Sequence, residues 1–293
     1  MDRRTFLKTG GAAAASAVAG KPRQETDYDP TEFVGVLVDT TRCIGCRSCE
    51  IACGMAHDLD VPDVENDDAL ESERTPSETQ WTVVNRYDTD EGEVFVKKQC
   101  LHCWQPACAS ACLTNAMYKT HEGPVIWRSD KCMGCRFCMV SCPFDIPKFE
   151  YDSWNPRIQK CNMCWERLEQ GLGPACVNAC PTDALTFGTK RELMEIARMR
   201  IYNHPDRYVH KIYGEHEVGG TGWLYLSAVP FEQLGFRTDL GTTPYPEYTR
   251  DFLYAVPVVL FAVPALLYGM RLLSEDSDAD VAPGAPQNRG ENH

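Results

Sequence analysis

The sequence predicts an α+β protein that consists of two related cysteine-rich modules, built from short strands and helices, and one C-terminal transmembrane helix. Three observations lead to this prediction. All 16 cysteines of the 293-residue chain fall into four groups of four. The groups are related to one another by internal repeats, and an uncharged run, 252–270, lies near the C-terminus.

The four cysteine groups follow one another between positions 43 and 180. They are Cys43, Cys46, Cys49 and Cys53; Cys100, Cys103, Cys108 and Cys112; Cys132, Cys135, Cys138 and Cys142; and Cys161, Cys164, Cys176 and Cys180. The first and third groups have the spacing C-x2-C-x2-C-x3-C, which in bacterial ferredoxins holds [4Fe–4S] clusters. Three thiolates of such a group bind one cluster, and the fourth points away and completes a neighbouring cluster. Gly45 and Gly134 let the loops approach the clusters closely.

Disulfides, structural zinc and scattered buried thiols fit this cysteine pattern less well. Disulfides between cysteines two residues apart in tight loops have poor geometry. Structural zinc uses paired C-x2-C knuckles rather than runs of four, and scattered buried cysteines would not fall into such groups. We therefore predict that all 16 cysteines bind iron–sulfur clusters.

Repeats and strand patterns predict the architecture of residues 33–200. The segment Cys43–Cys53 matches Cys132–Cys142, and 106–116 matches 174–184. A helix is expected from Thr189, where a capping box with Glu192 begins it, to about Ile201. Short strands are expected at Phe33–Asp39, Trp81–Tyr87, Glu93–Lys98 and Pro124–Arg128, of which the second and third form a hairpin.

The net charge of −13 argues against a nucleic-acid partner, because phosphate contacts need clustered Lys and Arg. The acidity is local. The segment 57–80 holds nine acids and one base, and 274–293 holds five acids and one base. Both are interpreted as a solvated loop and tail, with a docking surface for a basic partner as the alternative.

The two ends of the chain predict export and membrane anchoring. Residues 1–19 have a basic start with Arg3 and Arg4, an apolar middle and a small-x-small end, which is typical of a twin-arginine signal peptide. A linker, 20–32, follows. The run 252–270 is long enough to span a membrane, and a buried core helix is the alternative. Residues 201–249 form an extension without a readable motif.

The chain resembles the four-cluster ferredoxin-type iron–sulfur subunits of membrane-bound oxidoreductases. These include the iron–sulfur (beta) subunits of formate dehydrogenase and the accessory iron–sulfur protein of the membrane-bound uptake nickel–iron hydrogenase. A signal of its own together with a C-terminal anchor resembles the hydrogenase protein most. Beyond the cysteine groups, the matching segments are Lys97–Cys103, Asp145–Lys148, Phe187–Leu193, Tyr213–Thr221 and Val229–Pro230.

The resemblance implies two ferredoxin-like modules, each with two [4Fe–4S] clusters, and four cluster ligand sets. The sets are Cys43, Cys46, Cys49 and Cys180 (set A); Cys161, Cys164, Cys176 and Cys53 (set B); Cys100, Cys103, Cys108 and Cys142 (set C); and Cys132, Cys135, Cys138 and Cys112 (set D). We call the fourth cysteine of each group its trailing cysteine. The assignment of each trailing cysteine to a cluster follows from the resemblance and not from the spacing. The flanking cations Arg47, Lys131, Arg136 and Lys160, and also His102, are candidates for tuning the clusters or are ordinary structural residues.

The resemblance also implies a function. The chain would relay electrons between an exported catalytic subunit, a hydrogenase or a formate/molybdopterin oxidoreductase, and an integral quinone-reactive subunit. It would be anchored by a single helix in the cytoplasmic membrane, with the cluster domain on the extracytoplasmic side and the acidic tail inside. No catalytic motif is present in the sequence, so an electron carrier rather than an enzyme is expected. The alternatives are a non-redox metal-binding or disulfide scaffold and an independent enzyme.

Overall fold

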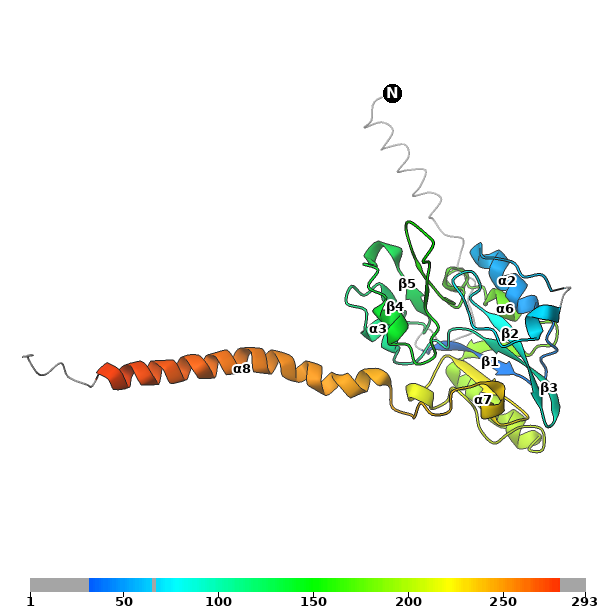
Figure 1. Cartoon of the computed structure of the whole chain (residues 1–293). Helices are drawn as coiled ribbons and strands as arrows, with labels where there is room; N and C mark the ends of the chain where they lie inside the picture. The colour runs from blue at the N-terminus through cyan, green and yellow to red at the C-terminus, as the bar shows by residue number, and fades with distance from the viewer. Residues whose placement is uncertain (1–31, 65–66, 280–293) are drawn as a thin grey trace, which may run out of the picture. The chain divides into compact units, whose positions relative to one another are not determined.

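The computed structural model describes residues 32–64 and 67–279 (Figure 1). The predicted signal peptide, nearly all of the linker and the end of the acidic tail lie outside these residues. The chain divides into two compact units, of which the first ends at Tyr245 and the second begins at Pro246. The first unit mixes short strands and helices, as predicted for an α+β protein.

A three-stranded sheet forms the centre of the first unit. Its middle strand is β1 (Val34–Asp39), with β8 (Leu185–Thr189) antiparallel on one side and β9 (Trp223–Leu226) parallel on the other. All residues of β1 and β9 are buried. Both strands are therefore nearly continuous apolar runs, as expected of strands that are covered on both faces.

Helix α7 (Lys190–Asn203) covers one face of this sheet, where Leu37 and Leu224 share a core with Leu193 of the helix. The predicted capping box is present. The hydroxyl of Thr189 accepts a hydrogen bond from the Glu192 N–H at 3.3 Å, and the Glu192 carboxylate accepts one from the Thr189 N–H at 3.0 Å. The helix begins where it was predicted and ends two residues later.

Three hairpins surround the cysteine loops. They are β2 (Val83–Thr89) with β3 (Gly92–Lys98), β4 (Met117–Lys119) with β5 (Val125–Trp127), and β6 (Lys148–Phe149) with β7 (Ile158–Gln159). The hairpin predicted around Asp88 is confirmed as β2 and β3. The strands β4, β6, β7, β8 and β9 were not predicted, because each has only two to five residues or lies in a segment without alternation.

Short helices follow the cysteine loops. They are α2 (Ser48–His57), α3 (Ala107–Ser110), α4 (Phe137–Val140), α5 (Trp165–Leu168) and α6 (Ala175–Asn178), with single 3-10 turns η1 (Asp67–Leu70), η2 (Ser129–Lys131), η3 (Glu217–Gly219) and η4 (Phe231–Leu234). With the exception of α2, each of these helices is about one turn long. Three of them, α3, α4 and α6, each carry one cysteine of the groups and are too short to build a core of their own.

The segment 201–249, which carries no readable motif, contributes to the main core. It supplies β9, and Tyr213 pairs with Tyr225 in an isolated bridge. Tyr213 also packs against Phe236 with 4.6 Å between the ring centroids. Because the other face of β1 packs on this aromatic group, the segment is part of the fold that holds the cysteine loops.

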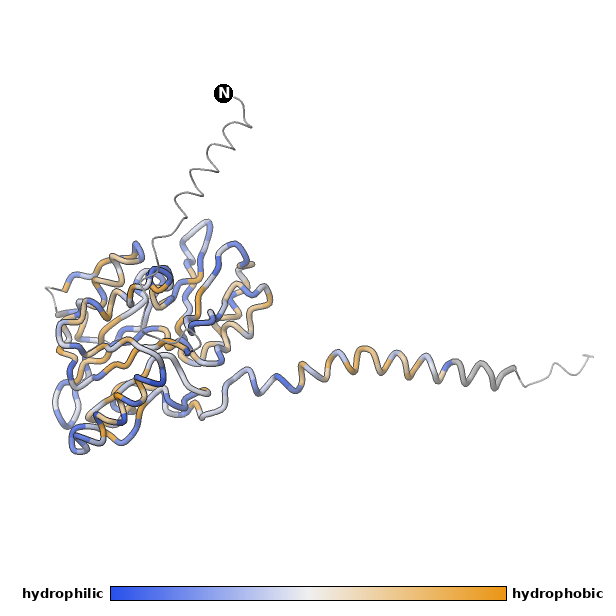
Figure 2. The backbone as a smooth tube through the Cα atoms, turned by 180° about the vertical axis from the view of Figure 1, so that it is seen from behind, coloured by the Kyte–Doolittle hydropathy of each residue, from blue (hydrophilic) through white to orange (hydrophobic). Residues whose placement is uncertain are grey.

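The second unit is dominated by α8 (Tyr245–Ala279). Its part from Tyr245 to Arg271 has a mean hydropathy of 2.0 over its most apolar window, and none of that window is buried. Length and composition suit a membrane-spanning helix, and Figure 2 shows the apolar stretch along it. Pro257 and Pro264 lie within the helix, which membrane helices tolerate. The alternative of a buried core helix is wrong for this segment.

Candidate metal centres

Set A is assembled by the register of the central sheet. In the antiparallel pairing of β1 with β8, Val38 lies opposite Leu185. Cys43 follows Val38 by five residues and Cys180 precedes Leu185 by five residues, so both cysteines emerge at the same end of the strand pair. The four cysteines of set A line one hollow. The sheet thus joins the first cysteine group to the last cysteine of the chain.

Set D is assembled by the same relation in the hairpin of β4 and β5. Met117 lies opposite Trp127, Cys112 precedes Met117 by five residues, and Cys132 follows Trp127 by five residues. Burial and the neighbouring thiols of the other three members of set D raise the pKa of Cys138 to about 11. The matching registers place Cys43 and Cys132, the first cysteines of the two groups that share one spacing, at equivalent positions after a strand.

Sets B and C are assembled by contacts between short helices. Helix α2, which carries Cys53, packs against α6, and α3 packs against α4. Burial raises the pKa of Cys53 to about 12, opposed by Lys97 and reinforced by Cys176 and Cys164. Burial likewise raises the pKa of Cys103, and the other three members of set C raise it further. In each of the four sets, the structure brings together cysteines that the resemblance groups.

Neighbouring sets also lie side by side. One pair of interacting thiols joins A to B, a second joins B to C, and a third joins C to D. These pairs are Cys49 with Cys176, Cys161 with Cys100, and Cys108 with Cys138. These electrostatic interactions between thiols order the sets as A, B, C and D.

Left-handed backbone wraps the loops around the thiols. Gly45 and Arg47 have φ of 70° and 57°, and Gly134 and Arg136 have φ of 72° and 59° at the matching positions. Glycine adopts this conformation without strain, whereas a side chain there costs free energy that the surrounding structure must offset. The two loops therefore share one backbone path around their sets.

A second left-handed residue stands three positions after a trailing cysteine. Asn115, Asp145 and Asp183 have φ of 55°, 50° and 50°, and asparagine and aspartate tolerate this region better than most side chains. The turn directs backbone N–H groups at sulfur. Cys112 accepts hydrogen bonds from the N–H groups of residues 116 and 117 at 3.2 and 3.3 Å.

Lys97 is a functional candidate that was not predicted from the sequence. Its side chain is buried, and its ammonium donates to Thr82 and, at 3.0 Å, to Gln99. It also lies over the ring of Trp223, 4.8 Å from the centroid. Burial opposes its charge, but thiols of sets A and B outweigh burial and raise its pKa. Lys97 thus places a positive charge between two sets, and its place in the matching segment Lys97–Cys103 was the signal for it.

The four predicted flanking cations behave differently from one another. Lys160 is buried beside set C, where its charge lowers the pKa of Cys108 against the larger effect of burial. The guanidinium of Arg47 is buried and paired with Glu50 at 3.1 Å, and that of Arg136 lies over Phe149. Lys131 is exposed. Lys160 is therefore the strongest candidate for tuning among these four.

His102 supplies a test of whether the sites fit clusters. The ring is buried, and its Nδ1 accepts a hydrogen bond from the Val125 N–H at 2.8 Å, so Nε2 carries the proton. Burial lowers the pKa of His102 well below its usual value, which keeps the ring neutral. Within the described residues, the buried Nε2 has no hydrogen-bond partner. A cluster sulfide or thiolate is an acceptor for this orphaned donor.

The chemistry of the donors fits iron–sulfur clusters as well. Burial raises the pKa of Cys43 and Cys164 to about 11, so these thiols need a positive partner to ionise at neutral pH. Iron is such a partner, and thiolates are the ligands of [4Fe–4S] clusters. In the part of the chain that the structure describes, no group of three or more His, Cys, Asp or Glu side chains is placed to hold a single metal ion.

The fold and the thiol sets define an iron–sulfur protein, and comparisons with known proteins agree. Residues 92–190 match the family model of the 4Fe–4S dicluster domain. A protein of Nitratidesulfovibrio vulgaris is 46% identical over 96% of this chain and 79% of its own length. The Hydrogenase-2 operon protein HybA of Escherichia coli O157:H7 is 33% identical over 90% of this chain and 92% of its own length. The iron–sulfur subunit of the nitrate-inducible formate dehydrogenase of Escherichia coli K12 is 34% identical over 70% of this chain and 71% of its own length.

The chain belongs to the family of iron–sulfur electron-transfer subunits that contains HybA and the formate dehydrogenase iron–sulfur subunits. The family resemblance inferred from the sequence is thereby confirmed.

The two matching loop glycines allow a direct test of the loop geometry. A Cβ at Gly45 would lie 2.5 Å from the ring of Phe95, whereas a Cβ at Gly134 would meet nothing within 4 Å. We expect Gly134→Ala to lose about 1–2 kcal/mol of stability through the left-handed backbone, and Gly45→Ala to lose a further 1–3 kcal/mol, roughly, through the clash. Chemical unfolding of the two purified variants measures this difference. Equal losses would contradict it.

Proposed function

We propose that this subunit conducts electrons through four [4Fe–4S] clusters, one at each of sets A to D, arranged as two ferredoxin-like modules. The observation that supports this most directly is the electrostatic interaction of a thiol in each set with a thiol of the next, in the order A, B, C and D. When bound, the clusters supply one-electron redox chemistry. The chain's own residues hold them at fixed positions, exclude water from them and set the charge around them.

The exposure of the thiols supports a route through the whole row. Cys46 of set A and Cys135 of set D are exposed, whereas three of the four thiols of set B are buried. A partner protein therefore has close access to the two end sets, and the middle sets are shielded from solvent. Electrons would enter at one end set and leave at the other.

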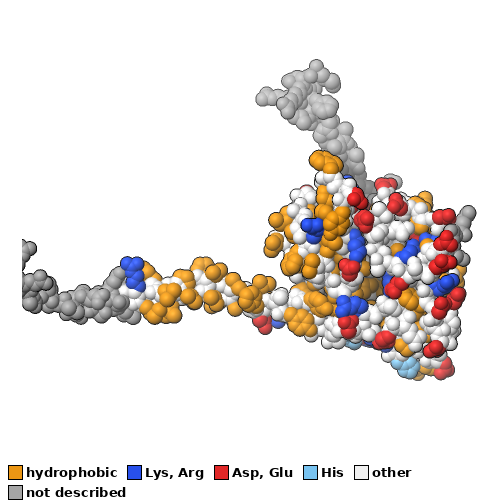
Figure 3. All heavy atoms as spheres, in the orientation of Figure 1, with side chains coloured by type: hydrophobic (Ala, Val, Ile, Leu, Met, Phe, Trp, Pro, Cys, Tyr) orange, Lys and Arg blue, Asp and Glu red, His pale blue; other side chains and the backbone are white. Residues whose placement is uncertain are grey.

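We assign the set D end to the membrane partner. Exposed apolar side chains surround this set, and Figure 3 shows hydrophobic side chains gathered on the lobe that carries α3, β4 and β5. The set D patch comprises Leu113, Met133, Phe137, Val140, Tyr151 and Trp154, which are 53–97% exposed. An exposed apolar surface of this kind favours a protein partner.

The course of the chain supports the same assignment. The guanidinium of Arg237 donates to the backbone carbonyl of Pro143, the residue after Cys142, at 3.2 Å. Within the first unit, the segment that precedes α8 is therefore tied at Arg237 to the residue that follows a ligand of set C.

The two partners and the location complete the proposal. A catalytic subunit, a hydrogenase or a formate/molybdopterin oxidoreductase, would exchange electrons with set A, and a quinone-reactive membrane subunit with set D. Helix α8 would anchor the subunit as a single span in the cytoplasmic membrane. The twin-arginine pattern of residues 1–19 supports a cluster domain on the extracytoplasmic side, since that export route carries folded, cofactor-loaded proteins.

The composition of the metal centres is the first test. Four [4Fe–4S] clusters require about 16 iron and 16 sulfide ions per chain. Iron and acid-labile sulfide measured in the anaerobically purified native complex, after subtraction of the catalytic subunit's own metals, are expected to reach these amounts. Zinc or oxidised thiols in place of iron would support the scaffold alternative instead.

Removal of one ligand tests the route. Cys138→Ala takes a thiolate from set D, and we expect the loss of one cluster signal in electron paramagnetic resonance spectra and at least a tenfold slower quinone reduction. Reduction of a soluble dye by the catalytic subunit should persist. Ser141→Ala, in the same loop, is the control and should change neither rate. Normal quinone reduction by a complex that lacks the set D cluster would refute the route through this set.

A charge on the set D patch tests the docking surface. Val140 is 81% exposed on α4, and Val140→Glu places a carboxylate on the proposed interface. Loss of an interface contact of about 2 kcal/mol corresponds to about 30-fold weaker binding of the membrane subunit, which co-purification and binding titrations measure. Tyr202→Glu, on α7 and 87% exposed, is the control. Equal binding of both variants would place the membrane partner elsewhere.

A further inference from the structure

The trailing cysteine of set B has a different backbone environment from the other three. Cys112, Cys142 and Cys180 each lie just after a four-residue helix and are followed, three positions later, by a left-handed Asn or Asp. Cys53 is followed by Gly54, and helix α2 continues to His57. As a result, α2 has 10 residues, whereas α4, which follows the matching cysteine motif, has four.

The difference changes the hydrogen bonds to sulfur. The turns after Cys112 and Cys142 direct backbone N–H groups at those sulfurs. Cys53 lies inside a helix, where N–H groups bond to carbonyl oxygens. In the described part of the chain, the sulfur of Cys53 accepts no hydrogen bond from a backbone N–H. The cluster at set B therefore lacks the turn donors that the trailing cysteines of sets C and D receive.

The extra turn of α2 brings another donor to the same set. The Nε2 atom of His57 lies 3.3 Å from the Sγ atom of Cys164. This bond joins a side-chain nitrogen directly to a ligand sulfur of set B. Because a cluster-bound thiolate has no proton to give, the proton of this bond must belong to Nε2.

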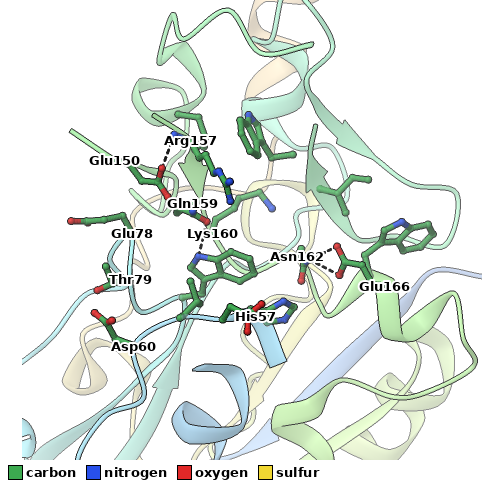
Figure 4. Close-up of a pocket in the computed structure, with 17 residues that line it drawn as sticks. His57, Asp60, Glu78, Thr79, Glu150, Arg157, Gln159, Lys160, Asn162 and Glu166 are labelled. Carbon is green, nitrogen blue, oxygen red and sulfur yellow. Dashed lines mark hydrogen bonds between the residues drawn. The ribbon is translucent and has the colours of Figure 1, made fainter. Parts of the chain in front are cut away.

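The imidazole ring of His57 is held in place from its other side. Its centroid lies 4.6 Å from that of the Trp81 ring, and the indole N–H of Trp81 donates to Gln159 at 3.1 Å. Figure 4 shows His57 in the hollow that Asp60, Glu166 and Lys160 also line. The tilted contact with Trp81 supports the ring on one side while its Nε2 atom faces Cys164.

We propose that His57 is a positioning residue that tunes the cluster of set B by donating a hydrogen bond to the sulfur of Cys164. An N–H donor stabilises the more negative, reduced cluster over the oxidised one, and so raises its reduction potential. His57 reaches this position because α2 extends beyond Cys53 to His57. The inference rests on the proposed function, because it requires a cluster at set B.

Redox titration of the assembled complex, followed by electron paramagnetic resonance, tests this inference. The signal that Cys176→Ala removes identifies the cluster of set B. In His57→Phe, which retains an aromatic ring against Trp81 but has no donor, the potential of this cluster is expected to fall while the other three stay unchanged. In His57→Gln, which retains an N–H donor, the potential is expected to return part of the way. His121→Phe, at an exposed histidine, is the control.

The outcomes separate the inference from the proposed function. An unchanged set B potential in His57→Phe, with all four cluster signals present, would overturn the role of His57 and leave the electron route intact. Absence of cluster signals from the unsubstituted complex would overturn the proposed function itself. If His57→Phe does not assemble, Trp81→Phe, which removes the indole bond to Gln159 and loosens the histidine, is expected to shift the same potential in the same direction by a smaller amount.

Discussion

The antiparallel pairing of β1 with β8 is the constraint on which the rest of the structure depends. This pairing brings together Cys43 and Cys180, which lie at the two ends of the cysteine-rich region. A slip of one residue would turn each side chain of the strand to the opposite face. Strand β9 pairs in parallel with the other edge of β1. Residues far downstream of the last cysteine therefore help to hold the first thiol set.

The buried thiols and the buried lysines depend on one another. Lys97 and Lys160 are among the most buried charged residues of the described chain, and an isolated buried ammonium is costly. The neighbouring thiols, once ionised and bound to iron, supply the opposite charge. Because ligand ionisation, metal binding and folding are linked in such sites, the cluster-loaded state is the one in which these charges are balanced.

Much of the candidate site was predictable from sequence, because a ligand spacing is a local property. The spacing identified all four cysteine groups, and the capping residues Thr189 and Glu192 located the start of α7. The pairing of trailing cysteines with distant groups depends on strand register, which spacing does not encode, and it came from resemblance. β9 was missed because a fully buried strand shows no alternation. Lys97 and His57 were missed as cluster neighbours because their positions depend on tertiary contacts across 79 and 107 residues of chain, to Cys176 and Cys164.

The two related halves show how one motif acquires different properties. Both loops, at Cys43 and at Cys132, follow the same left-handed path, yet Cys142 is followed by Pro143 and Cys53 by Gly54. Helix α4 ends at Val140, before Cys142 and Pro143, and the loop of set D carries exposed apolar residues such as Phe137 and Val140. Glycine lets α2 continue, and the added turn carries His57 to set B and leads into the acidic segment 57–80. In this segment, Arg74 binds Glu50 at 2.6 Å and Glu73 binds Tyr87 at 2.7 Å. These contacts hold the acidic segment against the fold, so it is not only a solvated loop.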